Sequence, residues 1–209
     1  MTYDPFDAAR DEMYEEIARE LYPDHKAQAI GEFTSERLQS YYIANPTVMC
    51  PAVDAIQEGR RLEANAHSAA AVVLYVTAIE LLLKATLLKP VVHGLVHSPG
   101  LADVIVQQAL GQPGFDRYTK LLSNLFREIV SMDIAAVNRK GASESLLSEC
   151  TGQQALRNKI IHQGVNATAG QAEQTRLVSV AVYELIVHPM LARLGLQVVE
   201  RGEIRQSVA

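Results

Sequence analysis

The stretch from Ala69 to Leu88 constrains the fold of this chain more than any other feature. It is apolar on nearly every side, which is typical of a helix that other helices surround. Its length would also allow a membrane span. However, Glu80 and Lys84 stand near its middle, and each unpaired charge would cost about 2.5–3.5 kcal/mol at the centre of a bilayer. We therefore expect the central helix of a soluble bundle and no membrane-spanning segment.

The residues before this stretch predict three further helices. The first begins near Pro5 and ends at Pro23, the second runs from Asp24 to about Ala44, and the third runs from Pro51 to Asn65. The apolar side chains that these patterns would turn inward are Ile30, Phe33, Leu38 and Tyr41 or Tyr42 in the second helix, and Val53, Ile56 and Leu62 in the third.

Two prolines and a polar segment divide the rest of the chain. Pro90 is expected to end the central helix and Pro189 to bend or interrupt the last one. Residues 91–113 predict a connection with a short helix, and residues 138–142 a polar loop. An amphipathic stripe between them consists of Phe115, Tyr118, Leu122, Leu125 and Ile129.

Capping patterns mark the two C-terminal helices. Thr151, followed three residues later by Gln154, predicts the start of one helix, and Gly164 predicts its end. Thr168 with Gln171 predicts the start of the last helix. No strand pattern is evident, so the sequence predicts an all-α fold.

The domain organisation follows from these elements. We expect an N-terminal helical extension in residues 1–50, a bundle in residues 51–195 and a tail in residues 196–209. A net charge of −5 argues against coating nucleic acid by bulk electrostatics, so any contact would need a local cationic patch. The N-terminus lacks the pattern of a signal peptide, and Cys50 and Cys150 are expected to be reduced and buried, which together predict a cytoplasmic protein.

The sharpest chemical pattern is a short polar motif, Arg157-Asn158-Lys159-Ile160-Ile161-His162. Together with the apolar segment Ala70–Lys84 and its embedded Glu80, this motif resembles the HEPN superfamily. The family's signature is an Arg, four to six residues and a His, often with a polar residue after the Arg. The resemblance covers roughly residues 51–195.

The resemblance implies an up-down bundle of four to five helices and a homodimer that brings two motifs together. It also implies cleavage of RNA without a metal ion or cofactor, often in toxin–antitoxin or anti-phage systems. Arg157 and His162 would be catalytic, with Glu80, Asn158 and Lys159 in support. An antitoxin or a nucleotidyltransferase could be a partner. Toxins paired with small nucleotidyltransferases commonly carry a Tyr two positions after the His, where this chain has Gly164, so nucleotidylation there does not carry over.

The chemistry of metal-free RNA cleavage fits these residue types. The 2′-hydroxyl attacks the adjacent phosphorus and leaves a cyclic phosphate and a 5′-hydroxyl. Histidine titrates near neutral pH, so His162 suits a proton acceptor or donor. The guanidinium of Arg157 stays charged and matches the geometry of phosphate oxygens. Five residues along a helix correspond to about 140° and about 7.5 Å, so a composite site from two chains would join the pair more naturally.

The same residues could instead have purely structural roles. Arg157 and Lys159 could form a solvated face, and His162 could cap a helix end. Glu80 could pair with Lys84 four residues later, or with Arg157 if it is buried. The functional alternative is a non-catalytic helical module that binds a partner protein, a nucleotide or RNA.

Two other constellations are weaker. His93 and His97 have a spacing that suits zinc on a helix, but Gly94 and Pro99 disfavour the helix and no third ligand is evident. A basic strip for RNA phosphates could form from Arg117, Lys120, Arg139 and Lys140, although such residues are more often ordinary solvated charge.

Overall fold

The computed structural model describes residues 5–207 except residues 97, 111–120, 125 and 128–130. The described part of the chain is mostly helical, at 78% helix, and eight of its α-helices pack together beside a small C-terminal hairpin. In chain order the elements are α1 (Pro5–Ala44), α2 (Cys50–Ala64), α3 (Ser68–Glu80), the π segment η1 (Leu81–Leu88), α4 (Lys89–Leu95), α5 (Pro99–Leu110), the 3₁₀ turn η2 (Ile134–Ala136), α7 (Leu146–Gln163), α8 (Ala169–Val182), the π segment η3 (Tyr183–Val187), α9 (His188–Arg193), β1 (Leu196–Val198), the 3₁₀ turn η4 (Glu200–Gly202) and β2 (Ile204–Gln206).

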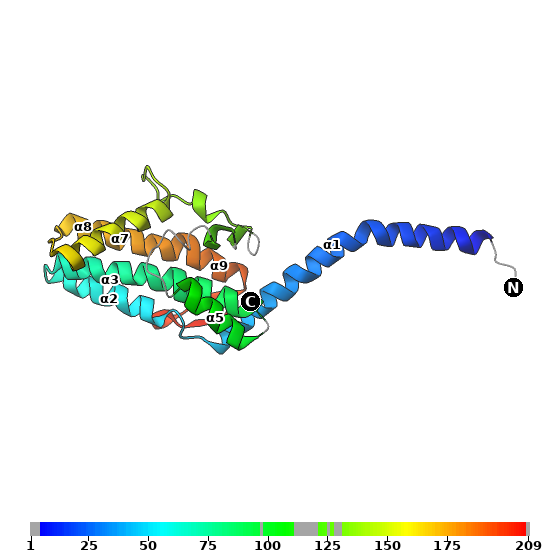
Figure 1. The fold of residues 1–209 in the computed structure, drawn as a ribbon, viewed down its shortest axis with the longest axis horizontal. Helices are drawn as coiled ribbons and strands as arrows, with labels where there is room; N and C mark the ends of the chain where they lie inside the picture. Colours follow the sequence, from blue (N-terminus) through cyan, green and yellow to red (C-terminus); the bar gives the residue numbers. More distant parts are fainter. Residues whose placement is uncertain (1–4, 97, 111–120, 125, 128–130, 208–209) are drawn as a thin grey trace.

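The predicted all-α bundle is confirmed, and α3 is its central helix. α3 contacts α2, α7 and α8, and these four helices lie side by side (Figure 1). Ala71, Val72, Tyr75, Val76 and Ile79 of α3 are almost completely buried, as expected for a helix that others surround. The half-buried side chains Thr77, Glu80 and Lys84 interrupt this apolar surface.

The expectation that Pro90 ends the central helix is wrong. The helix continues from α3 through the π segment η1 into α4, and Pro90 lies in the first turn of α4. In a regular α-helix, the N–H at position 90 would donate to the carbonyl oxygen of Thr86, four residues earlier, and proline lacks that N–H. The hydroxyl of Tyr42 donates to that oxygen instead, at 2.5 Å. A wider π turn before the proline and this substitute donor allow the helix to continue.

Pro189 behaves in the same way. The last helix runs from α8 through the π segment η3 into α9, with Pro189 in the first turn of α9. The structure therefore supports a local distortion at this proline and not a break. The two π segments contact each other inside the bundle.

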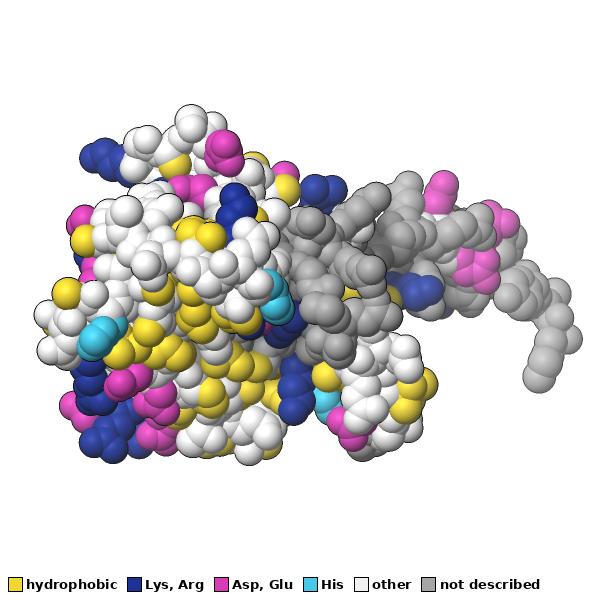
Figure 2. All heavy atoms as spheres, turned by 60° about the vertical axis from the view of Figure 1, so that its left-hand side comes forward, with side chains coloured by type: hydrophobic (Ala, Val, Ile, Leu, Met, Phe, Trp, Pro, Cys, Tyr) yellow, Lys and Arg dark blue, Asp and Glu magenta, His cyan; other side chains and the backbone are white. Residues whose placement is uncertain are grey.

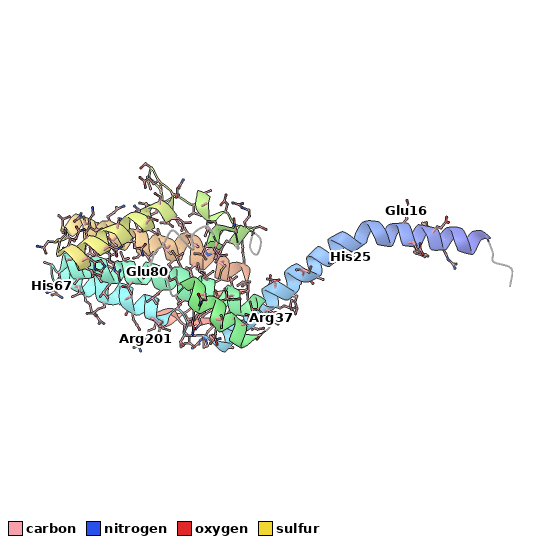
Figure 3. All side chains as sticks on the ribbon, viewed as in Figure 1. Glu16, His25, Arg37, His67, Glu80 and Arg201 are labelled. Carbon is pink, nitrogen blue, oxygen red and sulfur yellow. The ribbon has the colours of Figure 1, made fainter. Side chains whose placement is uncertain are left out.

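The helix α1 is continuous through Pro23, where two helices were expected. Figure 1 shows it projecting from the bundle, with its N-terminal end far from the other helices, and Figure 3 shows a change of direction near His25. Only its C-terminal part packs, on α4 and β2. Leu38 and Tyr42 are buried as predicted, but Ile30 and Phe33 are 57% and 50% exposed because this part of α1 has left the bundle.

The predicted capping box at Thr151 is also wrong. α7 begins six residues earlier, where the hydroxyl of Ser145 accepts a hydrogen bond from the backbone N–H of Ser148. Thr151 lies inside the helix and donates to the carbonyl oxygen of Leu147. The expected box at Thr168 is confirmed, with both reciprocal hydrogen bonds present.

The C-terminal residues form a β-hairpin, which the sequence did not predict. β1 and β2 pair antiparallel, although no strand pattern was evident. These strands are three residues long, too short for a visible alternation. The backbone N–H of Ile204 donates to the carbonyl oxygen of Pro46 at 2.8 Å, which ties the hairpin to the end of α1.

Other expectations have mixed outcomes. α2 matches the predicted helix, and Val53, Ile56 and Leu62 pack against the two core clusters. Residues 138–142 form a loop and Leu122 is buried. The remaining stripe residues Phe115, Tyr118, Leu125 and Ile129 lie outside the described residues.

The two cysteines were both expected to be buried. Cys150 is buried, and burial raises the pKa of its thiol, whereas Cys50 is only half-buried.

Among the described residues, two helices are long and apolar enough to span a membrane by length and composition, Ser68–Gly94 and Ala169–Arg193. The bundle buries 61% and 50% of their most apolar windows. A core helix passes the same test, so the cytoplasmic location stays a prediction.

Candidate functional site

The motif predicted to carry the chemistry lies on the second half of α7. The helix is regular from Leu146 to Gln163 and ends at Gly164, which adopts the left-handed conformation at φ 65°. This is the C-terminal glycine cap that the sequence predicted. Arg157 and His162 therefore lie on one helix, with His162 in its last turn.

The packing of α7 decides which motif side chains remain accessible. Leu156 and Ile160 pack against a buried cluster on α3 and α8 that includes Val72, Tyr75 and Ala172. Most of the other motif side chains face solvent. Asn158, Lys159, Ile161 and His162 are exposed, while Arg157 is half-buried.

Glu80 lies at the contact between α3 and α7. Its Oε1 atom accepts a hydrogen bond of 2.9 Å from Nε2 of Gln154. Gln154 precedes Arg157 by three residues, so the two side chains share a face of α7. The partner that the structure gives Glu80 is thus Gln154, whereas the sequence suggested the cations Arg157 and Lys84. The structure thus brings Glu80 next to the motif through Gln154, which the sequence did not indicate.

One donor of the Arg157 guanidinium is hydrogen-bonded to Asn158, and another has no acceptor among the described residues. Nη1 donates to Oδ1 of Asn158 at 3.1 Å. Nε is buried and has no hydrogen-bond partner among the described residues. A buried donor without an acceptor is costly and rare, and this one sits beside an exposed His-bearing helix end. Asn158 therefore orients Arg157, and the side chain remains only half-buried, so that an anion can approach the outer part of the guanidinium.

A second polar network ties α2, α3 and α8 together behind the motif. Glu63 forms an ion pair with Arg176 at 3.2 Å and accepts a hydrogen bond from the hydroxyl of Tyr75 at 2.6 Å. Burial and this hydrogen bond raise the pKa of Tyr75, so the hydroxyl stays protonated. Sequence reasoning missed this network because its members are up to 113 positions apart, from Glu63 to Arg176. Its role is to fix the helices that support α7.

The weaker constellations gain little from the structure. Arg139 is engaged by both carboxylate oxygens of Glu149, at 2.6 and 2.9 Å, so its charge is compensated. Arg117, Lys120 and His97 lie outside the described residues. His93 stacks on Tyr41 at 5.6 Å. The structure shows no cluster of three His, Cys, Asp or Glu side chains fit to hold a metal ion among the residues it describes.

Charge is distributed unevenly between the projecting helix and the bundle. Residues 1–33 hold nine acidic and three basic residues, a net charge of −6. Residues 34–209 hold fifteen acidic and sixteen basic residues, a net charge of +1. Figure 2 shows apolar side chains gathered across the middle of one face of the bundle, with charged side chains at the edges. The acidity of the chain therefore belongs to α1 and not to the elements that carry the motif.

Comparison of the chain with families of known proteins, with curated proteins and with solved structures finds no match. The resemblance to HEPN proteins rests on the motif residues, on the Glu80-bearing helix and on the helical bundle that contains both.

Proposed function

We propose that the protein is a metal-independent endoribonuclease of the HEPN class. The observation that carries this proposal is the state of Arg157: a half-buried guanidinium with an unsatisfied Nε donor, on the helix whose last turn exposes His162. A guanidinium that a neighbour orients and that no carboxylate among the described residues neutralises is suited to bind the oxygens of a phosphodiester. An exposed His at the same helix end suits the proton transfers.

The reaction would proceed by internal transfer. The RNA 2′-oxygen forms a bond to the adjacent phosphorus as the bond from phosphorus to the 5′-oxygen breaks. His162 would accept the proton of the 2′-hydroxyl or donate a proton to the leaving 5′-oxygen. Arg157 would stabilise the negative charge on the phosphoryl oxygens in the transition state. The products are a 2′,3′-cyclic phosphate and a 5′-hydroxyl, and no metal ion or cofactor takes part.

Glu80, Asn158 and Lys159 would support this step from different positions. Glu80 holds Gln154 and thereby the face of α7 that bears Arg157. Asn158 orients the guanidinium through its 3.1 Å contact. Lys159 is exposed and adds a cation for the RNA backbone. The net charge of +1 over residues 34–209 removes the objection that the chain is too acidic for RNA.

The alternative is a non-catalytic interaction module that binds a partner protein such as an antitoxin. One observation favours it: Ile161 and Val165 are 47% and 41% exposed within and just after the motif. Exposed apolar side chains this close in sequence suit a protein–protein contact. The same side chains would also suit the interface of a homodimer.

RNA cleavage by purified variants separates the two functions. Arg157→Ala and His162→Ala should each remove most cleavage of a structured RNA in the presence of EDTA, on the order of a hundredfold or more, and the double variant should lose little beyond that. The matched controls are Arg193→Ala and His188→Ala, which remove exposed side chains of the same types from α9 and should cleave normally.

Melting temperatures would show that the variants remain folded. Overexpression should impair host growth for the natural sequence and not for the double variant. Cleavage that survives both substitutions, or that EDTA abolishes, would overturn the ribonuclease proposal.

A further inference from the structure

A groove of about 400 Å³ lies apart from the motif, between α2, the π segment η3 and the C-terminal hairpin. Its apolar lining includes Ile56, Leu82 and Val180. Arg60 and Arg201 line it as exposed cations. Figure 3 shows Arg201 at the lower edge of the bundle, away from Glu80. No residue of α7 lines this groove, so the proposed ribonuclease chemistry makes no use of it.

The hairpin side of the groove is held in an unusual conformation. Gly202 lies so close to α2 that a Cβ atom there would come within 2.6 Å of Cγ2 of Val53. The preceding residue, Arg201, has φ 59° and ψ 15°, in the left-handed region that residues other than glycine seldom adopt. Backbone strain of this kind concentrates at binding sites, because packing elsewhere holds it in place. Here the result is to place an arginine at the edge of an apolar groove.

The opposite wall comes from the two π segments. Leu82 belongs to η1, and Tyr183 and Glu184 belong to η3. A π turn displaces side chains from the positions that a regular helix would give them, and such turns are frequent at functional sites. Tyr183 is half-buried, and burial followed by the nearby Glu184 raises the pKa of its hydroxyl, which therefore remains a hydrogen-bond donor.

The cations of the groove are not neutralised by the protein itself. Within the described ranges, the guanidinium groups of Arg60 and Arg201 form no hydrogen bond or ion pair. By contrast, the neighbouring Arg61 pairs with Glu58 at 3.0 Å. With Glu184 as the one acidic side chain among the residues that line the groove, the lining carries a net charge of +1. That charge matches a single anionic group above an apolar body.

We propose that this groove binds a small amphipathic monoanion, an organic carboxylate with an aromatic or aliphatic body. The apolar body would lie on Ile56, Leu82 and Val180. The carboxylate would meet the guanidinium groups of Arg60 and Arg201, which form bidentate hydrogen bonds with this geometry. The site is independent of the RNA-cleaving residues, so either proposal can fail without the other.

Binding of 2-naphthoate to the full chain tests the site, with calorimetry as the readout. The natural sequence should bind saturably at up to millimolar concentration. Arg60→Gln and Arg201→Gln should each weaken binding on the order of tenfold or more, because each removes a charge-assisted contact. The matched control Arg61→Gln removes the adjacent arginine of α2, which does not line the groove, and should bind as the natural sequence does.

A second variant separates binding from folding. Arg201→Gly should leave the melting temperature unchanged or higher, because glycine accepts the left-handed conformation, yet it should lose binding as Arg201→Gln does. The neutral amide, 2-naphthamide, should bind at least tenfold more weakly than the acid. The proposal is overturned if the natural sequence binds no naphthoate, if the amide binds equally well, or if Arg61→Gln weakens binding as much as Arg201→Gln.

Discussion

Glu80 is a carboxylate in the most apolar helix of the chain, and Gln154 explains how the helix accommodates it. The side chain is half-buried at the line where α3 meets α7, so one oxygen can accept from the amide while the group keeps contact with solvent. A half-buried carboxylate with a hydrogen bond does not need a buried cation. The pair fixes the register between α3 and α7 and thereby the position of Arg157, three residues beyond Gln154.

Substitution of Glu80 should therefore cost a moderate amount of stability. Glu80→Ala removes the carboxylate that accepts a hydrogen bond from the amide of Gln154, and we expect a loss of about 1 kcal/mol in the free energy of unfolding by urea titration. Glu80→Gln keeps an acceptor oxygen and should lose less. The control Glu58→Ala removes an exposed carboxylate paired with Arg61 and should cost under about 0.5 kcal/mol.

The size of this loss separates the earlier interpretations of Glu80. A loss of about 3–5 kcal/mol would mean that Glu80 compensates a buried charge such as Arg157. A loss equal to that of Glu58→Ala would mean that the contact with Gln154 contributes nothing, and the supporting role of Glu80 would be abandoned.

The site was partly predictable because its signals are local. The position of His162 in the last turn before Gly164 follows from residues within two positions of each other, and the structure confirms it. The partner of Glu80 was not predictable, because Gln154 lies 74 positions away. No spacing rule joins two helices that meet only through tertiary packing.

At the scale of helices, Pro23 and Pro90 were misleading signals, whereas the helix is distorted just before Pro189, in line with the expected bend. Pro23, Pro90 and Pro189 each lie inside or at the first turn of a continuing helix. Sequence reasoning treats proline as a break because it removes a donor and its ring crowds the preceding turn. Inside the bundle, packing of the apolar helix outweighs that cost, and for Pro90 a distant hydroxyl replaces the lost donor. The sequence shows the proline but not the distant hydroxyl that replaces its missing donor.

Tyr42 and Pro90 should consequently be coupled in stability. Tyr42→Phe leaves the buried carbonyl oxygen of Thr86 without the tyrosine donor, and we expect a cost of about 1–3 kcal/mol. In a Pro90→Ala background, the restored N–H can donate to that oxygen, so the same substitution should cost at least about 0.5 kcal/mol less. Urea titration of the four proteins gives the coupling.

The control for this cycle is Tyr14→Phe, because Tyr14 is 59% exposed on the projecting part of α1. That substitution should change stability by under about 0.5 kcal/mol in either background. Strict additivity of Tyr42→Phe and Pro90→Ala would show that the tyrosine does not substitute for the missing donor.

For the whole molecule, the main feature is the separation of an acidic arm from a nearly neutral bundle. Residues 5–33 hold eight acidic and three basic residues, and this net charge of −5 lies on a helix that projects away, so it does not raise the negative potential around α7 as much as the total charge suggests. The composition alone made RNA binding look unfavourable. In three dimensions, the motif lies on the nearly neutral bundle, where a few cations can lie close together. The sequence does not show this separation of the acidic helix from the bundle.

The geometry of α7 leads to the last prediction, a two-fold homodimer with a composite site. Arg157 and His162 are five residues apart on a regular helix, so they point in directions that differ by about 140°. The two side chains of one chain are therefore poorly placed to contact the same phosphate. Two chains related by a two-fold axis can place the Arg of one beside the His of the other. Light scattering at micromolar concentration should show a dimer.

Mixing of variants tests whether the site is shared. Equal amounts of Arg157→Ala and His162→Ala chains should recover about a quarter of the natural activity, since half of the dimers are mixed and each of these holds one complete site. Mixing natural chains with the double variant should leave about a quarter for a composite site, but about half for a site within one chain. A monomer, or a dimer without recovery in the first mixture, would contradict the composite site. The exposed Ile161 and Val165 would then favour a surface for a partner protein.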